Sequence, residues 1–428
     1  MMVAVGTDVA HDMMGFIDAS PTPYHAVHNV AARLSDAGFE EFDPRRGGQP
    51  GARFVVRDGG LVAWFDGDSP AKAPRLLGAH TDSPNLRIRP RPDLGVAGFR
   101  QLAVEVYGGA LLNSWLDRDL GLAGRVAVRD GAEIRQVLVR SGGPMLRVPQ
   151  LAIHLDRGIN DKGLQLDPQQ HLSPVWGLGA AHDGDFVEWV AALTEVATTD
   201  VLGWDIACFD TEPPALIGPD GDLLASARLD NLCSTFGALE ALLALRWAGG
   251  GPGVIVLHDH EEVGSTSTTG ADSAWVASVL EQRSAALGWE RVEHLRWIES
   301  GAMVSADMAH ATHPNHTGRH EPNHWVLAGG GPVIKHNENQ RYATDGTGAA
   351  RFRLACEDAG VPVQDYSHRG DLPCGSTIGP LSSARLALDT VDVGMAQLSM
   401  HSARELMATD DVGHMVAAFS AWLQGGGR

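Results

Sequence analysis

Short apolar segments that stop abruptly at ionisable residues constrain the fold of this chain most strongly. Residues 75–79 form one such segment, which ends at His80, and residues 254–257 form another, which ends at the polar stretch 258–262. Helical spacing of apolar residues over 236–247 precedes the second segment. Strands that alternate with helices predict a parallel sheet covered by helices on both faces. We therefore expect an α/β fold with a mixed, largely parallel sheet whose carboxyl edge carries the site.

The middle of the chain has a different pattern. Between residues 91 and 224, short segments of alternating polarity, such as 102–107 and 125–128, are separated by glycine-rich turns. This pattern indicates a β-rich insertion. We expect a discontinuous catalytic domain made of residues 1–90 and 225–428, interrupted by a β-rich domain over 91–224.

Net charge and cysteine content restrict the classes of binding partner and the cellular compartment that we expect. The formal net charge of −20 argues against nucleic acid and anionic membranes as partners, because both would repel the chain. The four cysteines are too sparse to form a disulfide framework and have no CxxC spacing. The N-terminus lacks a basic and apolar leader, and no apolar run is long enough to span a membrane. A cytoplasmic location is expected.

Two carboxylate motifs follow the predicted strands. In His80-Thr81-Asp82 the histidine can bind a metal while the aspartate orients it, although an isolated example could equally be a polar turn. Glu261 and Glu262 are adjacent, and two neighbouring carboxylates repel each other unless a cation lies between them. One glutamate can then bind metal while the other takes a proton from water. The alternative is a solvated acidic loop.

Three further candidates are unremarkable one at a time. Asp230 precedes a predicted helix, where it could simply be the N-cap. Asp307 and His401 have no distinctive neighbours. The dense histidine run over 310–324 contains prolines that break a continuous helix, so we interpret it as mainly structural or supporting rather than as the metal site.

Seven motifs in a fixed order favour functional roles for residues that are unremarkable one at a time. The chain resembles the aspartyl aminopeptidase family of zinc metallopeptidases, from Tyr24 to the C-terminal helix. The motifs are GAHTDSPNLRIRP, SARLDNLCS, HDHEEVGSTSTTGADS, VSADMAHATHPN, GPVIKHNENQRYATD, DLPCGSTIGP and MHSARE.

The resemblance implies a site with two zinc ions in each subunit. Asp230 would bridge the ions, His80 and Asp307 would complete one site, and Glu262 and His401 would complete the other. Glu261 would be the general base, with Asp82 supporting His80. Carboxylate and imidazole ligands without thiolate suit such a site, and they also suit Mn²⁺ or Co²⁺.

Substrate preference is argued from Lys335. It lies in a weakly polar predicted strand, 331–335, where an ammonium is costly unless it meets an anion. The resemblance makes it the partner of an acidic side chain at the substrate's N-terminus, so peptides that begin with Asp or Glu are the expected substrates. The alternative is a surface lysine with its head in water. Tyr342 is expected to stabilise the tetrahedral intermediate by donating a hydrogen bond.

The resemblance also implies an oligomer. His154 lies in the β-rich insertion, a dimerisation domain in this family, and is expected to act in the site of the neighbouring subunit. Assembly as dimers within a tetrahedral dodecamer is expected.

Two other functions remain open at this point. One is the same dinuclear aminopeptidase with a preference for neutral residues such as Leu or Met. The other is a non-catalytic homologue that only assembles, although it would have no reason to keep every ligand and the base. A deacylase or amidohydrolase on a related dinuclear site is disfavoured by the span of the resemblance.

Overall fold

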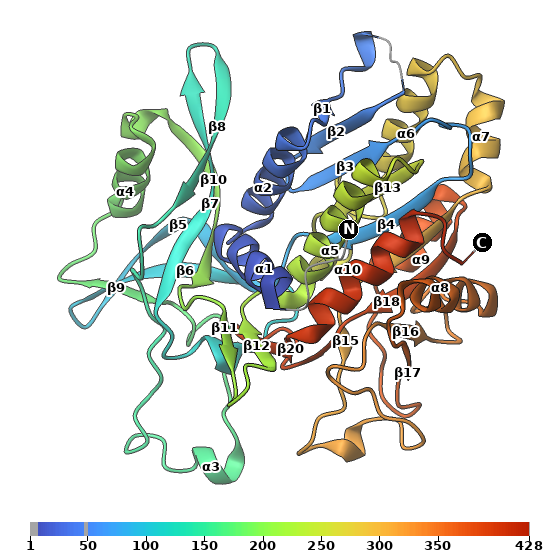
Figure 1. The fold of residues 1–428 in the computed structure, drawn as a ribbon. Helices are drawn as coiled ribbons and strands as arrows, with labels where there is room; N and C mark the ends of the chain where they lie inside the picture. Colours follow the sequence, from blue (N-terminus) through green and yellow to red (C-terminus); the bar gives the residue numbers. More distant parts are fainter. Residues whose placement is uncertain (1–6, 47–49, 428) are drawn as a thin grey trace. The chain divides into compact units, whose positions relative to one another are not determined.

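Three β-sheets organise residues 7–46 and 50–427, which are the residues described by the computed structural model (Figure 1). The chain divides into two compact units. The first consists of Met1–Asp82, Pro214–Met400 and Glu405–Arg428, and the second consists of Ser83–Pro213 together with His401–Arg404.

A nine-stranded mixed sheet forms the centre of the first unit, in the order β1-β2-β3-β13-β4-β14-β18-β16-β17. Strands β13, β4, β14 and β18 run parallel to one another in its middle, and antiparallel pairs join them to the strands on either side. The strands are β1 (Glu40–Glu41), β2 (Ala52–Arg57), β3 (Gly60–Phe65), β4 (Arg75–His80), β13 (Gly253–His258), β14 (Ala302–Ala306), β16 (Val333–His336), β17 (Gln364–Ser367) and β18 (Asp389–Gly394).

Helices cover both faces of this sheet because its central strands are apolar on both sides. In β13, Ile255 and Leu257 join one buried cluster with α1, α2, α5, α8 and α10, whereas Val254 and Val256 join another with α6 and α7. Helices α5 and α10 lie side by side (Figure 1). The helices are α1 (Thr7–Ala19), α2 (Pro23–Asp36), α5 (Leu229–Ala248), α6 (Trp275–Ala286), α7 (Arg291–Glu299), α8 (Gly346–Ala359), α9 (Ile378–Leu386) and α10 (Asp410–Leu423).

A smaller sheet completes the first unit, in the order β11-β12-β20-β19-β15. Its strands are β11 (Ala215–Ile217), β12 (Leu223–Ser226), β15 (Ala309–His310), β19 (Ala396–Leu398) and β20 (Glu405–Ala408). Three short 3₁₀ helices also belong to this unit: η1 (Pro44–Arg46), η4 (Glu261–Val263) and η5 (Thr317–Arg319).

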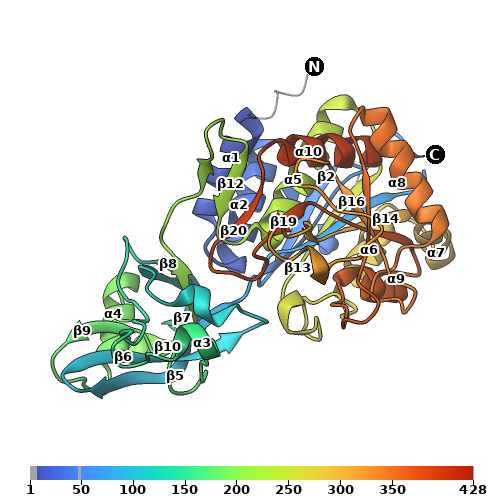
Figure 2. The ribbon, with the colours of Figure 1, turned by 90° about the horizontal axis from the view of Figure 1, so that it is seen from below.

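The second unit is built on an antiparallel six-stranded sheet, β8-β7-β10-β5-β6-β9 (Figure 2). Phe186 and Val190 of α4 pack against this sheet and fill its own separate core. The elements are β5 (Asn85–Val96), β6 (Phe99–Tyr107), η2 (Leu112–Trp115), β7 (Leu120–Asp130), β8 (Glu133–Arg140), α3 (Ile159–Lys162), β9 (Val175–Leu178), α4 (Asp185–Thr194), η3 (Thr198–Asp200) and β10 (Val201–Asp210).

The predicted mixed, largely parallel α/β fold is confirmed. The strands expected at 75–79 and 254–257 are β4 and β13, and the helix expected over 236–247 lies within α5. The second unit runs from Ser83 to Pro213, whereas the predicted β-rich domain was placed at 91–224, and it also includes residues 401–404 from near the end of the chain.

Candidate metal centre

Three parallel strands bring candidate ligands to one edge of the large sheet. His80 ends β4 and lies opposite His258, the last residue of β13, in the strand register. Asp307 directly follows β14, which pairs with the other side of β4. Because parallel strands present their carboxyl ends at the same edge, His80, Asp307 and the η4 glutamates that follow β13 converge there.

The helix α5 supplies Asp230 to the same edge. Its first turn is irregular at Asp230, with φ −82° and ψ 104°, and the helix begins after Arg228. The backbone N–H of Asp230 donates to Oε2 of buried Glu405 at 3.0 Å, and the amide of Asn231 donates to the carbonyl oxygen of Ala306 at 2.8 Å. These contacts fasten the start of α5 to β20 and β14. Asp230 is therefore not the helix N-cap that its sequence position allowed.

His80, Asp230 and Asp307 form a buried group whose ligand atoms all lie within 4.8 Å of one another. Nε2 of His80 lies 3.3 Å from Oδ1 of Asp230 and 3.5 Å from Oδ1 of Asp307. Carboxylate oxygens of Glu261 and Glu262 lie within the same distance of His80 and of each other, and one of Glu262 lies equally near Asp230. This set of imidazole and carboxylate ligands is the one that zinc and related divalent ions accept.

The electrostatics of the group favour a bound cation. Burial alone would lower the pKa of His80, yet hydrogen bonds to the carboxylates of Asp230, Asp307 and Asp82 raise it well above its usual value. Burial raises the pKa of Glu261 to about 8; His80 opposes this shift and the neighbouring aspartates add to it. An excess of buried carboxylates that repel one another is relieved by divalent ions, so the residues fit a metal centre.

Asp82 supports both sides of this group. Its Oδ1 lies 3.4 Å from Nδ1 of His80. The two carboxylate oxygens also accept the backbone N–H groups of Glu261 and Glu262, each at 3.1 Å. The sequence predicted the contact with His80. The second pair of contacts, which holds η4 in place, was not predicted.

Lys335 lies beside the group, on β16. The side chain is 3% exposed, which excludes the surface lysine considered above. Nζ donates to the carbonyl oxygen of Met308 at 3.1 Å and lies 3.5 Å from Oδ2 of Asp307. It also lies 5.2 Å from the ring centre of Tyr342. Burial raises the pKa of the Tyr342 hydroxyl, and the Cys374 thiol beside it adds to the shift, so the phenol remains a hydrogen-bond donor.

The remaining two predicted residues, His401 and His154, belong to the second unit. His401 has a positive φ of 65°, its Nδ1 donates to the carbonyl oxygen of Gly109 at 3.1 Å, and its own carbonyl oxygen accepts from the N–H of Leu111. The bond through Nδ1 leaves Nε2 as the nitrogen suited to a metal. His154 lies in an exposed turn between Leu151 and Leu155.

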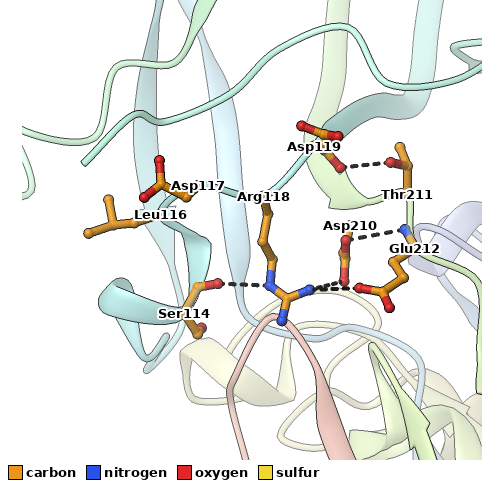
Figure 3. A pocket seen from close by; sticks show the side chains of 8 residues that line it. All are labelled: Ser114, Leu116, Asp117, Arg118, Asp119, Asp210, Thr211 and Glu212. Atoms are coloured by element: carbon orange, nitrogen blue, oxygen red, sulfur yellow. Dashed lines mark hydrogen bonds and ion pairs between the residues drawn. The ribbon is translucent and has the colours of Figure 1, made fainter.

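A pocket of about 560 Å³ in the second unit is lined by residues from 114–119 and 210–212, two of which contact the segment 401–404 (Figure 3). Arg118 crosses it, donating to the carbonyl oxygen of Ser114 at 2.9 Å and to Asp210 at 2.8 Å. Arg404 reaches the same wall, where it donates to the carbonyl oxygen of Glu212 at 3.1 Å. The hydroxyl of Ser114 accepts the N–H of Ala403 at 2.8 Å. These contacts fix the backbone next to His401.

The histidine-rich segment is a loop. No α-helix lies between His310 and His324 in this described stretch, and the short 3₁₀ helix η5 covers three residues of it, so the run is not one continuous helix. Nε2 of His320 accepts the N–H of His313, and Nδ1 of His313 accepts the N–H of Asn315. These two histidines thus satisfy the backbone of their own loop.

Sequence reasoning missed two supporting carboxylates. Glu405 is the last residue of the motif MHSARE, and this position could have marked it as a candidate. Its contact with Asp230 could not be predicted from the sequence. Asp392, inside β18, belongs to none of the seven motifs.

Among the described residues, no helix combines the length and apolar character needed to cross a membrane.

A mixed sheet with buried imidazole and carboxylate ligands at its carboxyl edge defines the class: a metal-dependent hydrolase. The model of the M18 family, aminopeptidase I zinc metalloprotease, matches residues 16–423. The chain therefore belongs to the M18 family and is a zinc metallo-aminopeptidase.

Similar proteins cover nearly the whole chain. A probable M18 family aminopeptidase 2 of Mycobacterium leprae is 53% identical over 422 residues, which is 97% of each chain. A chain in the cryo-EM structure of the Ape4 and Nbr1 complex matches with a TM-score of 0.92 and 33% identity, over 98% of this chain and 86% of that one. A chain of the S. cerevisiae mApe1 dodecamer matches with a TM-score of 0.86 and 27% identity, over 98% and 97%.

Proposed function

We propose that this aminopeptidase removes N-terminal Asp or Glu from peptides, using two zinc ions and a glutamate base. The observation that carries the proposal is the buried ammonium of Lys335 beside the metal-binding group. A buried cation at the edge of a substrate site favours a substrate anion. The proposed pocket thus differs from one for neutral Leu or Met, where an ammonium would be costly.

The proposed metal ligands are residues whose imidazole and carboxylate atoms lie close enough together to hold an ion. Two zinc ions would be held by Asp230, which both would share, with His80 and Asp307 at one ion and Glu262 and His401 at the other. Zinc held there supplies a Lewis acid and lowers the pKa of a bound water toward ~7. Mn²⁺ or Co²⁺ would fit the same ligands.

Each remaining residue has one task in the proposed mechanism. The carboxylate of Glu261 takes a proton from the attacking water and later gives it to the leaving amine. The hydroxyl of Tyr342 donates a hydrogen bond to the carbonyl oxygen as negative charge develops on it. Lys335 binds the acidic side chain of the first residue and so orients the scissile bond.

Self-association belongs to the same proposal, with dimers assembled into a tetrahedral dodecamer and His154 acting in the neighbouring site. Likeness to a chain of the mApe1 dodecamer supports it. So does a run of exposed apolar side chains around His154, because exposed apolar patches mark interaction surfaces. They are Leu151, Ile153 and Leu155, exposed by 58%, 48% and 75%.

A cytoplasmic location is also proposed. The four cysteines are free thiols, and three of them are buried, as in proteins of a reducing compartment.

The test of the substrate preference is a panel of aminoacyl nitroanilides, with Asp, Glu, Leu and Met, assayed on the zinc-reconstituted enzyme. Wild type is expected to favour Asp and Glu. Lys335→Ala should lower kcat/KM roughly 10–100-fold on the acidic substrates and much less on Leu, because it removes a charge-assisted hydrogen bond. Lys72→Ala, at an exposed lysine, is the control and should change neither.

Three results would count against parts of this proposal. An equal loss on Asp and Leu in Lys335→Ala, with unchanged zinc content, rejects Lys335 as the selectivity residue. A wild-type preference for Leu or Met favours the neutral aminopeptidase. Zinc binding without any hydrolysis favours the non-catalytic assembly.

A further inference from the structure

Asp392 is a fully buried carboxylate that the proposed mechanism does not use. It lies in β18, between β14 and β16, and is 0% exposed. Burying a carboxylate is costly unless hydrogen bonds satisfy both of its oxygens. The groups that donate hydrogen bonds to Asp392 therefore indicate its role.

Both oxygens of Asp392 accept hydrogen bonds from other segments. The hydroxyls of Ser305 and Thr377 donate to Oδ1 at 2.7 and 2.6 Å. The backbone N–H of Ala343 donates to Oδ2 at 2.6 Å. In return, the N–H of Asp392 donates to the hydroxyl of Thr344 at 2.9 Å.

The partners of Asp392 adjoin proposed functional residues. Ala343 directly follows Tyr342, and Ser305 stands two residues before Asp307 on β14. Asp392 itself belongs to none of the groups of potential metal ligands found among the described residues. Its link to the proposed site is therefore indirect, through hydrogen bonds to the backbone and hydroxyl groups of residues near Tyr342 and Asp307.

The hydrogen bonds around Asp392 match the acceptor oxygens of a carboxylate. Burial raises its pKa, while the charge of Lys335 and the hydrogen bonds from Thr377, Ser305 and Ala343 oppose that shift. Three donors point at its two oxygens. An asparagine has one acceptor oxygen and one NH₂ group, so it would turn a donor toward the N–H of Ala343 or toward the two hydroxyls.

We propose that Asp392 is a positioning residue for Tyr342. By accepting the N–H of Ala343 and donating its own N–H to the hydroxyl of Thr344, it holds the two residues that directly follow Tyr342. The phenol is thereby held next to Lys335 and Asp307, ready to donate to the carbonyl oxygen of the substrate. This inference rests on the role given to Tyr342 in the proposed function.

The experiment is a double-mutant cycle of Asp392→Asn with Tyr342→Phe, measured by kcat, KM, zinc content and Tm. Tyr342→Phe alone should lower kcat by about 10²–10³-fold, the range for one lost oxyanion donor. Asp392→Asn should lower kcat roughly tenfold, with KM and zinc content little changed. The double variant should be no slower than Tyr342→Phe, because Asp392 acts through Tyr342.

Thr390→Val is the matched control. Thr390 lies on the same strand, is buried, and donates to the carbonyl oxygen of Leu388 at 3.0 Å, away from the Tyr342 loop. It should lower Tm without changing kcat. If Asp392→Asn does not fold, Thr344→Val replaces it in the cycle, since it removes the other hydrogen bond to the loop and keeps the side-chain shape.

The possible failures are distinguishable. Effects of Asp392→Asn and Tyr342→Phe that multiply in the double variant, or a wild-type kcat for Asp392→Asn, overturn the inference and leave the proposed function standing. A wild-type kcat for Tyr342→Phe removes the proposed role of Tyr342, and the positioning role falls with it. Loss of zinc from Asp392→Asn would assign the residue to the metal centre.

Discussion

Glu261 and Glu262 are adjacent in the chain but face different surroundings. An oxygen of Glu262 lies within 4.8 Å of Asp230, in a group that could hold a metal. Glu261 joins only the group around His80, and burial raises its pKa to about 8. A carboxylate with a raised pKa is the stronger base once it is ionised, and bound divalent ions would favour its ionised form, as a general base requires. The two neighbours can thus divide metal binding and proton transfer between them.

Glu261→Gln tests this division. Turnover should fall by roughly 10²–10⁴-fold, because the variant removes the general base. Zinc content should stay near that of wild type, because none of the proposed metal ligands is changed. Zinc analysis together with kcat on an aminoacyl nitroanilide measures both. Glu357→Gln, on the exposed side of α8, is the control. Wild-type turnover in Glu261→Gln would reject the role.

His258 gives the metal centre a pH-dependent neighbour. Burial lowers its pKa to about 4, from an ordinary 6.5, so the folded protein keeps the ring neutral while the unfolded chain protonates it. Stability should therefore fall as the pH drops from about 6.5 to 4, by about 3 kcal/mol from this group, and level off below. In urea unfolding, His258→Gln should show a shallower slope with pH, and His182→Gln, at an exposed histidine, should not. Equal slopes in all three proteins would contradict the assignment.

At the scale of elements, the short helix η4 depends on a residue from another strand. Asp82 follows β4, and its carboxylate accepts the first two N–H groups of η4, much as a cap would. The same side chain lies against His80. One carboxylate therefore sets the relative position of His80, at the end of β4, and of the η4 glutamates that follow β13.

Asp82→Asn should lower zinc affinity by roughly 10–100-fold, the usual effect of changing a group that orients metal ligands. A chelator competition measures it. Glu290→Ala is the matched control, because Glu290 caps α7 in a capping box with Glu293. It should cost about 1 kcal/mol of stability and leave zinc affinity unchanged. Equal zinc affinity in both variants would show that Asp82 does not orient the centre.

At the scale of the whole molecule, the second unit carries two proposed site residues and a separate core. His401 belongs to the second unit because hydrogen bonds with Gly109, Ser114 and Glu212 hold residues 401–404 there. His154 lies in an exposed apolar turn. An enzyme whose site draws on such a turn would need a neighbouring subunit to be complete.

Mixing inactive subunits tests that requirement. When His154→Ala and Glu261→Gln are co-expressed, mixed dimers should contain one intact site, so about one quarter of the wild-type activity should return. Asp230→Ala with Glu261→Gln is the control pair; both residues belong to the first unit, and no activity should return. Failure of the first pair to recover would place His154 outside the neighbouring site.

Much of this architecture could be predicted from local patterns. The apolar segments before His80 and His258 identified central strands, because a sheet covered on both faces needs apolar side chains in both directions. Pro314 and Pro322 correctly excluded a continuous helix over the histidine-rich segment. Asp230 could not be separated from an N-cap in this way, since both roles place an aspartate before a helix.

The sequence alone determined the fold class and the ordered motifs shared with zinc aminopeptidases, because periodicity and residue order are local properties. Tertiary structure decided which groups meet. Asp82 reaches the backbone of Glu261, Glu405 holds Asp230, and Asp392 holds the loop of Tyr342, across separations of between 49 and 179 residues. Such contacts follow from strand order and register, which no single segment encodes.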